Sequence, residues 1–356
     1  MKNLLLALLF LVSLVGMSSC SEDFEVAAPY KDVTVVYGMF DIADTAHYIR
    51  IQKVFMDQTK SAFVTSQIPD SSYFKDLNVH IKTISGTNVI ADTKLDRVDM
   101  DLEGLPKDQG TFFTKPHFAY KFKSTLSPAY TYRLVITNVA TGAVDSAETR
   151  VINNNGTPSD GGFYVAELVP GTNFTLDLHR SAVSKITFNV KMPNNAGRDN
   201  SNPGYLEGYI RFKYVSEKNG VMTDSSFVWN FASTTGIPGD NIKLETTVSS
   251  FMSTVATTLG PVGTDTKRYL DSADVFVWAA NEDYYRYRQA NQAQLGITAD
   301  QIQPNYTNIR GKDVLGLFSN RAQRIRINIP YSKASIDSFI RSRVTAPLNF
   351  VGLATH

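Results

Sequence analysis

The chain has a single cysteine, Cys20, in 356 residues. One cysteine excludes a framework of intramolecular disulfides and any zinc site that is built from several cysteine ligands. A chain of this length can bury a hydrophobic core large enough to stabilise it without such cross-links. The composition therefore favours a globular protein whose stability comes from burial.

The chain also lacks an excess of charge of either sign. Lysine and arginine total 35, against 34 aspartate and glutamate, which gives a formal net charge of +1. Proteins that bind nucleic acid usually show a basic surplus or a basic stripe, because they neutralise backbone phosphates. We therefore expect no nucleic-acid partner.

Signatures of common catalytic and nucleotide-binding sites are missing as well. There is no HExxH zinc motif, no GxSxG nucleophile elbow and no glycine-rich phosphate loop. The five histidines are dispersed, without partners at metal-ligand spacing. These observations predict a protein without enzymatic activity, metal or cofactor. Paired carboxylates from distant segments would leave no such signature, so a hydrolase stays open as an alternative.

One long apolar run is present, at the start of the chain. Lys2 precedes the nearly continuous apolar run Leu4–Val15, and small residues lead to Cys20. The run is shorter than the ~20 residues that span a bilayer as a helix. These features are typical of a lipoprotein signal peptide (residues 1–19) that ends at a lipid-attachment cysteine. We expect Cys20 to carry fatty acids such as palmitate; the alternative is an ordinary signal peptide cut nearby, which leaves a free thiol.

Acidic residues follow that cysteine directly, within a polar tether at 20–29. This pattern resembles the surface-export signal of lipoproteins in the Bacteroidota, and it implies display on the outer face of the outer membrane. The alternative is a solvated segment that its charges keep extended. The candidate export residues are Ser21, Glu22, Asp23 and Glu25.

Residues 30–152 are predicted to form an N-terminal β-sandwich. Apolar and polar residues alternate with period two in several segments, and turn residues separate them. Many short strands without intervening helices are typical of an antiparallel, immunoglobulin-like sandwich. The clearest segments are 33–40, 47–55, 79–83, 130–138 and 144–151.

A polar, turn-rich stretch at 153–162 contains no apolar side chain of the core-forming kind, and it is the predicted linker between two domains. The second domain, 163–356, is predicted to be a β-rich sandwich with two or three inserted helices. Its clearest hairpin turns at Asn219-Gly220, because Asn-Gly supplies the positive φ angles of a type I′ turn. A helix is expected near 246–259, where apolar residues follow the 3.6-residue period. A second helix is expected near 282–295, where a capping residue is followed by acidic residues.

Aromatic side chains in the second domain suggest a carbohydrate platform. Tryptophan and tyrosine rings can stack on sugar faces while their polar edges stay in contact with water. The competing interpretation is that these rings fill the sandwich core and a helix–sheet contact. The candidate carbohydrate contacts are Trp229, Trp278, Tyr284 and Tyr285.

Three Asp-hydroxyl-Ala triplets resemble the O-glycosylation acceptor of exported Bacteroidota proteins. Aspartate and serine also initiate turns, which is the structural alternative. The candidate acceptors are Thr45, Ser146 and Ser272.

Two regions resemble a known family. Near the mature start, Tyr37–Asp41 is followed by Asp44–Ile51; near the end, the tyrosine-rich Asp283–Tyr287 precedes an Asn-Ile-x-Gly turn (308–311) and Gly316–Phe318. Together they resemble a domain-of-unknown-function family of Bacteroidota outer-membrane lipoproteins whose genes often accompany TonB-dependent receptors. The resemblance implies an envelope role and supplies no catalytic residues.

The residues of the second region also carry a structural expectation. The tyrosines should pack one side of a helix on the sheet. Gly311 and Gly316 should permit the close backbone approach that brings Leu317 and Phe318 into the core.

We therefore expect a surface-exposed outer-membrane lipoprotein with a binding or accessory role, beside a TonB-dependent transporter. One alternative is an adhesin or fimbria-like structural subunit, which would polymerise through a donated strand. The other is a hydrolase acting on glycans or peptides, which would need a cleft with converging carboxylates.

Overall fold

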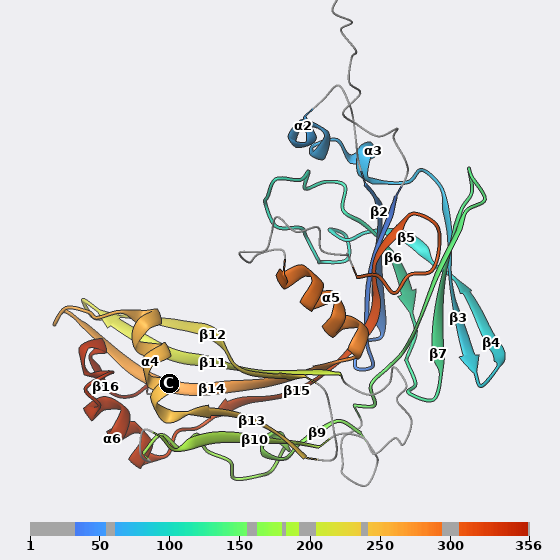
Figure 1. Cartoon of the computed structure of the whole chain (residues 1–356). Helices are drawn as coiled ribbons and strands as arrows, with labels where there is room; N and C mark the ends of the chain where they lie inside the picture. The colour runs from blue at the N-terminus through green and yellow to red at the C-terminus, as the bar shows by residue number, and fades with distance from the viewer. Residues whose placement is uncertain are drawn as a thin grey trace, which may run out of the picture.

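The computed structural model describes residues 33–54, 61–154, 162–179, 183–191, 204–235, 241–293 and 306–354. The predicted signal peptide, Cys20, the acidic export residues and most of the predicted linker lie outside the described residues. The protein is mainly β, as predicted, and forms two β-sandwiches that share one large sheet (Figure 1).

The shared sheet contains nine strands among the described residues, and most neighbours run antiparallel. Two pairs are parallel, which an all-antiparallel prediction does not include: the first strand beside the long strand 314–329, and the last strand beside 266–280. Across the sheet the strands are β12 (Val221–Thr235), β11 (Tyr205–Lys218), β14 (Thr266–Ala280), β15 (Val314–Ile329), β1 (Thr34–Asp41), β2 (Ala46–Lys53), β6 (Phe118–Lys123) and β5 (Asp96–Asp99), with β16 (Phe350–Leu353) paired to β14.

The N-terminal sandwich packs β1, β2 and β6 against a second, four-stranded sheet. The predicted alternation is confirmed, since Val79, Ile81 and Leu134 are fully buried between the two layers. Two short helices, α2 (Ala62–Ser66) and α3 (Pro69–Ser72), were not predicted, because four or five residues are too few to show a helical period. The second sheet is β4 (Asn88–Lys94), β3 (Leu77–Ser85), β7 (Thr131–Asn138) and β8 (Val144–Arg150), in that order.

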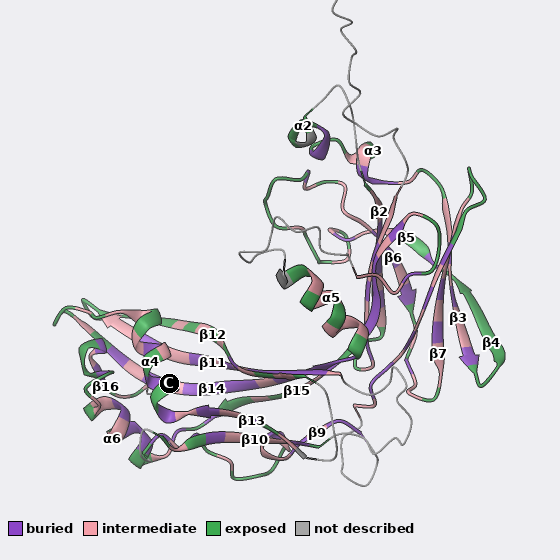
Figure 2. Cartoon of the chain, viewed as in Figure 1, coloured by how far each residue is buried: buried purple, intermediate pink, exposed green. Residues whose placement is uncertain are grey.

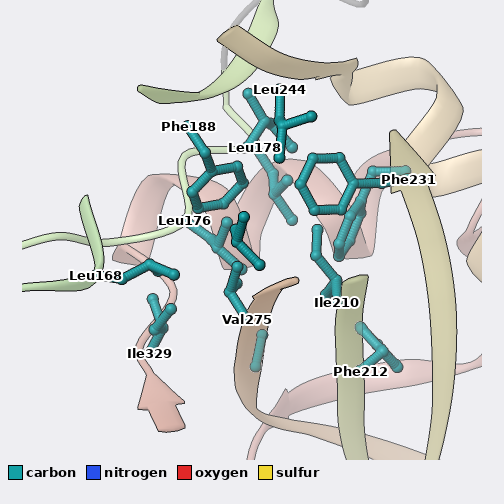
Figure 3. Packing of buried hydrophobic residues seen from close by; sticks show 14 of the residues in the cluster. Leu168, Leu176, Leu178, Phe188, Ile210, Phe212, Phe231, Leu244, Val275 and Ile329 are labelled. Atoms are coloured by element: carbon teal, nitrogen blue, oxygen red, sulfur yellow. The ribbon is translucent and has the colours of Figure 1, made fainter. Parts of the chain in front are cut away.

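The C-terminal sandwich packs β11, β12, β14 and β15 against a smaller sheet. Figure 2 shows buried residues concentrated between these layers, and Figure 3 shows Phe188 and Leu244 of the small sheet meeting Ile210 and Val275 of the large one. Burying such side chains contributes roughly 1.5–3 kcal/mol each. The remaining elements are β13 (Asn241–Thr247), β10 (Lys185–Lys191), β9 (Tyr164–Val165), α4 (Val248–Leu259), α5 (Glu282–Ala293), α6 (Lys333–Arg341) and two short 3₁₀ turns, Ala166–Leu168 and Ala346–Leu348.

Local signals place the hairpin and the helices close to their predicted positions. Asn219 and Gly220 have φ angles of 54° and 78°, as a type I′ turn requires. The helix expected near 246–259 begins at Val248, and the Thr247 side chain caps it by accepting a hydrogen bond from the Ser250 amide at 3.1 Å. Helices α4 and α5 match the two predicted ranges, and α6 is a third helix, within the two or three expected for this domain.

Strand β15 belongs to both sandwiches. Its first half, from Val314, pairs with β1, and its second half pairs with β14. Phe318 is fully buried in the N-terminal core, where its ring centroid lies 4.9 Å from that of Phe40. The first sandwich thus contains residues from the end of the chain as well as from 30–152.

The close approach of β15 to β1 depends on Gly316. This residue has a φ angle of 117°, and a Cβ atom built on it would overlap the carbonyl oxygen of Val36. Leu317 and Phe318, directly after it, are 4% and 0% exposed. The expectation is confirmed for Phe318, which lies in the N-terminal core, whereas Leu317 is buried on the opposite face of the strand and belongs to neither core cluster.

Candidate functional site

A hollow of about 220 Å³ lies where the two sandwiches meet. Strands β11 and β14 supply most of it, while β1, β15 and α5 each contribute a side chain. Pockets for drug-sized ligands measure ~300–1,000 Å³, so this hollow suits a single small ring. Its lining residues are Met39, Tyr205, Glu207, Tyr209, Trp278, Ala279, Ala280, Tyr284 and Arg321.

The alternation of strand side chains explains why these residues gather there. On β11, Leu206 and Ile210 point into the C-terminal core, so Glu207 points to the opposite face of the sheet. The register places Glu207 directly opposite Trp278 on β14, and Tyr205 opposite Ala280. One face of the shared sheet therefore closes a core while the other presents aromatic side chains.

Glu207 is the centre of the polar contacts in the hollow. The Tyr205 and Tyr209 hydroxyls donate hydrogen bonds to its two oxygens at 2.7 and 2.9 Å, and Arg288 of α5 forms an ion pair with it. Burial, reinforced by the hydrogen bond to Glu207, raises the pKa of both tyrosines. Glu207 is 5% exposed, so this carboxylate is buried but provided with donors and a cation.

Arg321 stands at the rim with its guanidinium on an aromatic ring. Its Cζ lies 4.7 Å from the centroid of the Trp278 ring, within cation–π range. Its Nε lies 3.7 Å from Asp41 Oδ2, a long contact, and its side chain is 45% exposed. The ring of Trp278 thus holds a partly exposed cation at the rim of the hollow.

Helix α5 lies in the angle between the two sandwiches (Figure 1). Tyr285 stacks on Tyr205 of β11, with centroids 5.6 Å apart, and Tyr287 meets Tyr37 of β1 edge-on at 6.0 Å. Burial, with the hydrogen bond to Tyr37, raises the pKa of Tyr287 to about 12. The tyrosines therefore pack the helix on the sheet, as expected, and hold Tyr284 in the wall of the hollow.

The start of α5 is tied to β15 by the residues of the second sequence motif. The Asn281 side chain caps the helix by accepting from the Tyr284 amide at 3.1 Å. Asp283 accepts hydrogen bonds from Tyr306 and from Asn308, and Asn308 pairs with both backbone groups of Phe318, at 2.7 and 3.0 Å. The spacing of this motif is therefore explained by one hydrogen-bond network that positions the helix.

The four predicted carbohydrate contacts separate into three environments. Trp278 and Tyr284 lie in the hollow, and Tyr285 supports it by stacking on Tyr205. Trp229 points to the other face of the sheet, where its ring packs against Phe251 in the core. Its place there fits the competing interpretation, core filling.

Sequence reasoning missed the polar residues of the hollow. The period-two pattern Tyr205-x-Glu207-x-Tyr209 places all three side chains on one face, and this signal could have revealed Glu207. No comparable signal marks Arg321, because its position depends on the pairing of β15 with β14.

The candidate glycosylation residues differ in exposure. Thr45 is exposed in the turn between β1 and β2, whereas Ser146 is half-buried on β8. Ser272, on β14, is 8% exposed, so its hydroxyl is largely hidden from solvent. Modification of any of the three stays a prediction.

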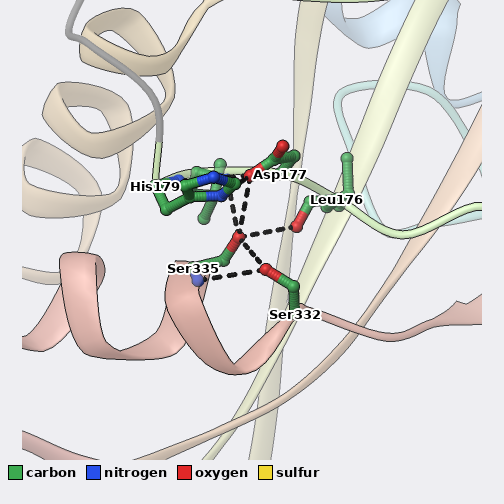
Figure 4. Close-up of polar contacts among 6 residues, drawn as sticks. Leu176, Asp177, His179, Ser332 and Ser335 are labelled. Carbon is green, nitrogen blue, oxygen red and sulfur yellow. Dashed lines mark hydrogen bonds and ion pairs between the residues drawn. The ribbon is translucent and has the colours of Figure 1, made fainter.

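A serine, a histidine and an aspartate meet near the start of α6 (Figure 4). Ser335 Oγ donates to the Leu176 carbonyl at 3.1 Å, accepts from the Leu178 amide at 2.7 Å, and lies 3.4 Å from Asp177 Oδ1. The His179 ring nitrogen Nδ1 contacts the same Asp177 oxygen. Nucleophilic catalysis needs a serine bonded to a histidine base and open to substrate. Ser335 is fully buried and bonded to the backbone, so this cluster fastens α6 to residues 176–178.

Two further findings bear on function. In the part of the chain that the structure describes, no His, Cys, Asp or Glu residues gather in a group of three or more that could hold a metal ion. None of the described helices has the length and apolar character needed to cross a membrane.

No protein-family model matches this chain, and no curated protein matches it either. Its function is therefore inferred from the residues themselves.

Proposed function

We propose that this chain is a lipid-anchored binding protein of the outer-membrane surface, which acts as an accessory to a TonB-dependent transporter and binds carbohydrate. The observation that carries the binding activity is the hollow lined by Trp278, Tyr284 and two further tyrosines. Aromatic rings that keep one side accessible are well suited to the apolar faces of sugar rings. The volume of the hollow suits one sugar unit, either free or at the end of a chain.

A binding role is favoured over hydrolysis by the carboxylates at the hollow. Glycoside hydrolysis uses two carboxyl groups on either side of the bond that is cleaved. Among the described residues that line the hollow, Glu207 is the one carboxylate, and Arg288 and two tyrosine hydroxyls already engage it. With these partners, Glu207 is suited to fixing the shape of a binding site and not to cleaving a bond.

The two tryptophans allow a direct test of the site. A sugar that enters the hollow is expected to change the fluorescence of Trp278 but not that of Trp229, which lies on the core face. Titration of a panel of sugars should therefore change the emission of the wild type and of Trp229→Phe, and leave the emission of Trp278→Phe constant. Equal responses from the two variants would place the ligand elsewhere.

The anchor rests on the residues around Cys20 and on the resemblance to outer-membrane lipoproteins. Acylation would make Cys20 the first residue of the mature chain, and two or three acyl chains give stable membrane attachment. Mass spectrometry of the native protein should find a mature N-terminus at Cys20 that carries fatty acids, and Cys20→Ser should leave the protein in the soluble fraction. An unmodified N-terminus downstream of Cys20 would refute the anchor.

A further inference from the structure

We infer that the hollow selects a sugar that carries a carboxylate, such as a uronic acid, and that Arg321 recognises the carboxylate. This inference rests on the proposed binding function and names the class of ligand. Three features of the described residues support it: the balance of charge in the hollow, the presentation of the guanidinium, and the volume beside it.

The charges that face the hollow leave one cation, Arg321, only loosely paired. Of the described residues that line it, Glu207 is acidic and Arg321 is basic. Glu207 is paired with Arg288, so its charge is compensated from within the protein. Arg321 has a carboxylate partner in Asp41, but their contact is long, at 3.7 Å from Nε to Oδ2, and 45% of the arginine side chain is exposed.

The guanidinium of Arg321 contacts an aromatic ring and remains accessible to a carboxylate. Its Cζ lies 4.7 Å from the centroid of the Trp278 ring, and 45% of the side chain is exposed, so the residue is held by the ring and can still be reached by a ligand. Two parallel N–H donors can bind both oxygens of a carboxylate, in a bond about twice as strong as a neutral hydrogen bond. Contact with the ring also reduces the rotamer freedom that the arginine would lose on binding.

The space next to Arg321 fits a ring that bears this carboxylate. Met39, Tyr284 and Trp278 line the same hollow as the guanidinium, and its volume of about 220 Å³ accommodates one small ring. A sugar ring would contact these apolar walls while its carboxylate meets Arg321 at the rim. A neutral sugar would make the same wall contacts without the charged bond, so we expect the charge to determine the preference.

Isothermal titration of the full mature chain tests this inference. The probes are D-galacturonate and D-glucuronate, the matching neutral sugars D-galactose and D-glucose, and benzoate as a ring carboxylate that is not a sugar. We expect a uronate to bind at least about tenfold more tightly than its neutral counterpart, as a charge-assisted pair predicts. Arg321→Gln should remove this preference, and Arg321→Lys should keep part of it, since a lysine offers charge without the paired donors.

Arg286→Gln is the matched control. Arg286 is an exposed arginine of α5 that pairs with Glu282 one turn earlier, so its replacement removes the same charge without touching the hollow. Uronate binding should be unchanged in this variant. Urea unfolding of Arg321→Gln should match the wild type, because the side chain is at the surface.

Each other outcome overturns a different statement. Equal binding of acidic and neutral sugars would refute the role of Arg321 and leave the proposed carbohydrate site standing. Benzoate binding as tightly as the uronates would refute a sugar as the ligand. Absence of binding by every sugar would refute the proposed function itself.

Discussion

Gly316→Ala is expected to lower the free energy of unfolding by about 4 kcal/mol or more. The φ angle of 117° is one that alanine rarely adopts, and the added Cβ would overlap the Val36 carbonyl oxygen. The clash can be relieved only if β15 moves away from β1, which would also withdraw Phe318 from the N-terminal core. Urea unfolding followed by circular dichroism measures the loss.

Gly352→Ala is the control for this prediction. Gly352 also lies in a strand of the shared sheet, but no atom lies within 4 Å of the position its Cβ would take. Its replacement should change the unfolding free energy by less than about 1 kcal/mol. If both variants unfold at the urea concentration of the wild type, Gly316 does not control the contact between β1 and β15.

A chain cut down to residues 30–152 is expected not to fold. These residues include β1 to β8 but lack β15. The whole length of β1 pairs with the first half of β15. The fragment would also lose three buried side chains of its core, Ile309, Val314 and Phe318, and expose the edge of β1. Its amide NMR spectrum should show the narrow dispersion of an unfolded chain, and its urea titration should show no cooperative transition.

The matched control keeps all the strands of both sandwiches and breaks only the chain between them. A protease site placed within 153–162 allows cleavage after folding, and the two parts should stay associated because β15 remains in place beside β1. A well-dispersed spectrum from 30–152 alone would contradict the shared-sheet account. It would show that the first sandwich is stable without the end of the chain.

Local features of the fold could be predicted because their signals are local. Asn219-Gly220 determines a hairpin turn through the backbone angles of two residues, and Thr247 and Asn281 cap helices within one turn. Period-two alternation identified strands such as β3 and β7 and showed which side chains share a face. In each case the cause and its effect lie within about ten residues.

The sharing of one sheet could not be predicted in this way. Tyr37 on β1 and Leu317 on β15 are neighbours in the sheet although they are far apart in the sequence, and a parallel pair leaves no turn signal. A polar stretch at 153–162 resembles a domain linker whether or not the strands on either side later join. Long-range pairing is decided by the packing of both cores together.

The same limit applies to the candidate site. Trp229 and Trp278 both lie on strands of the C-terminal block, and alternation states which residues share a face but not which face the core covers. The structure shows that the small sheet covers the face of Trp229 and leaves Trp278 to the hollow. Arg321 entered the site through the register of β15, which no local pattern determines.

The tyrosine-rich motif has an indirect connection with binding. Asp283 and Asn308 fasten α5 to β15, and Tyr287 fixes the helix against β1. These contacts determine where Tyr284 stands in the wall of the hollow. The motif therefore builds the scaffold of the site, while Trp278 and Arg321 are expected to meet the ligand.

A crystal structure of the protein grown with D-galacturonate tests the central claim most directly. The account predicts one sugar in the hollow, with its ring against Tyr284 and Trp278 and its carboxylate on the guanidinium of Arg321. A sugar bound on another surface, with the hollow holding water alone, would contradict it.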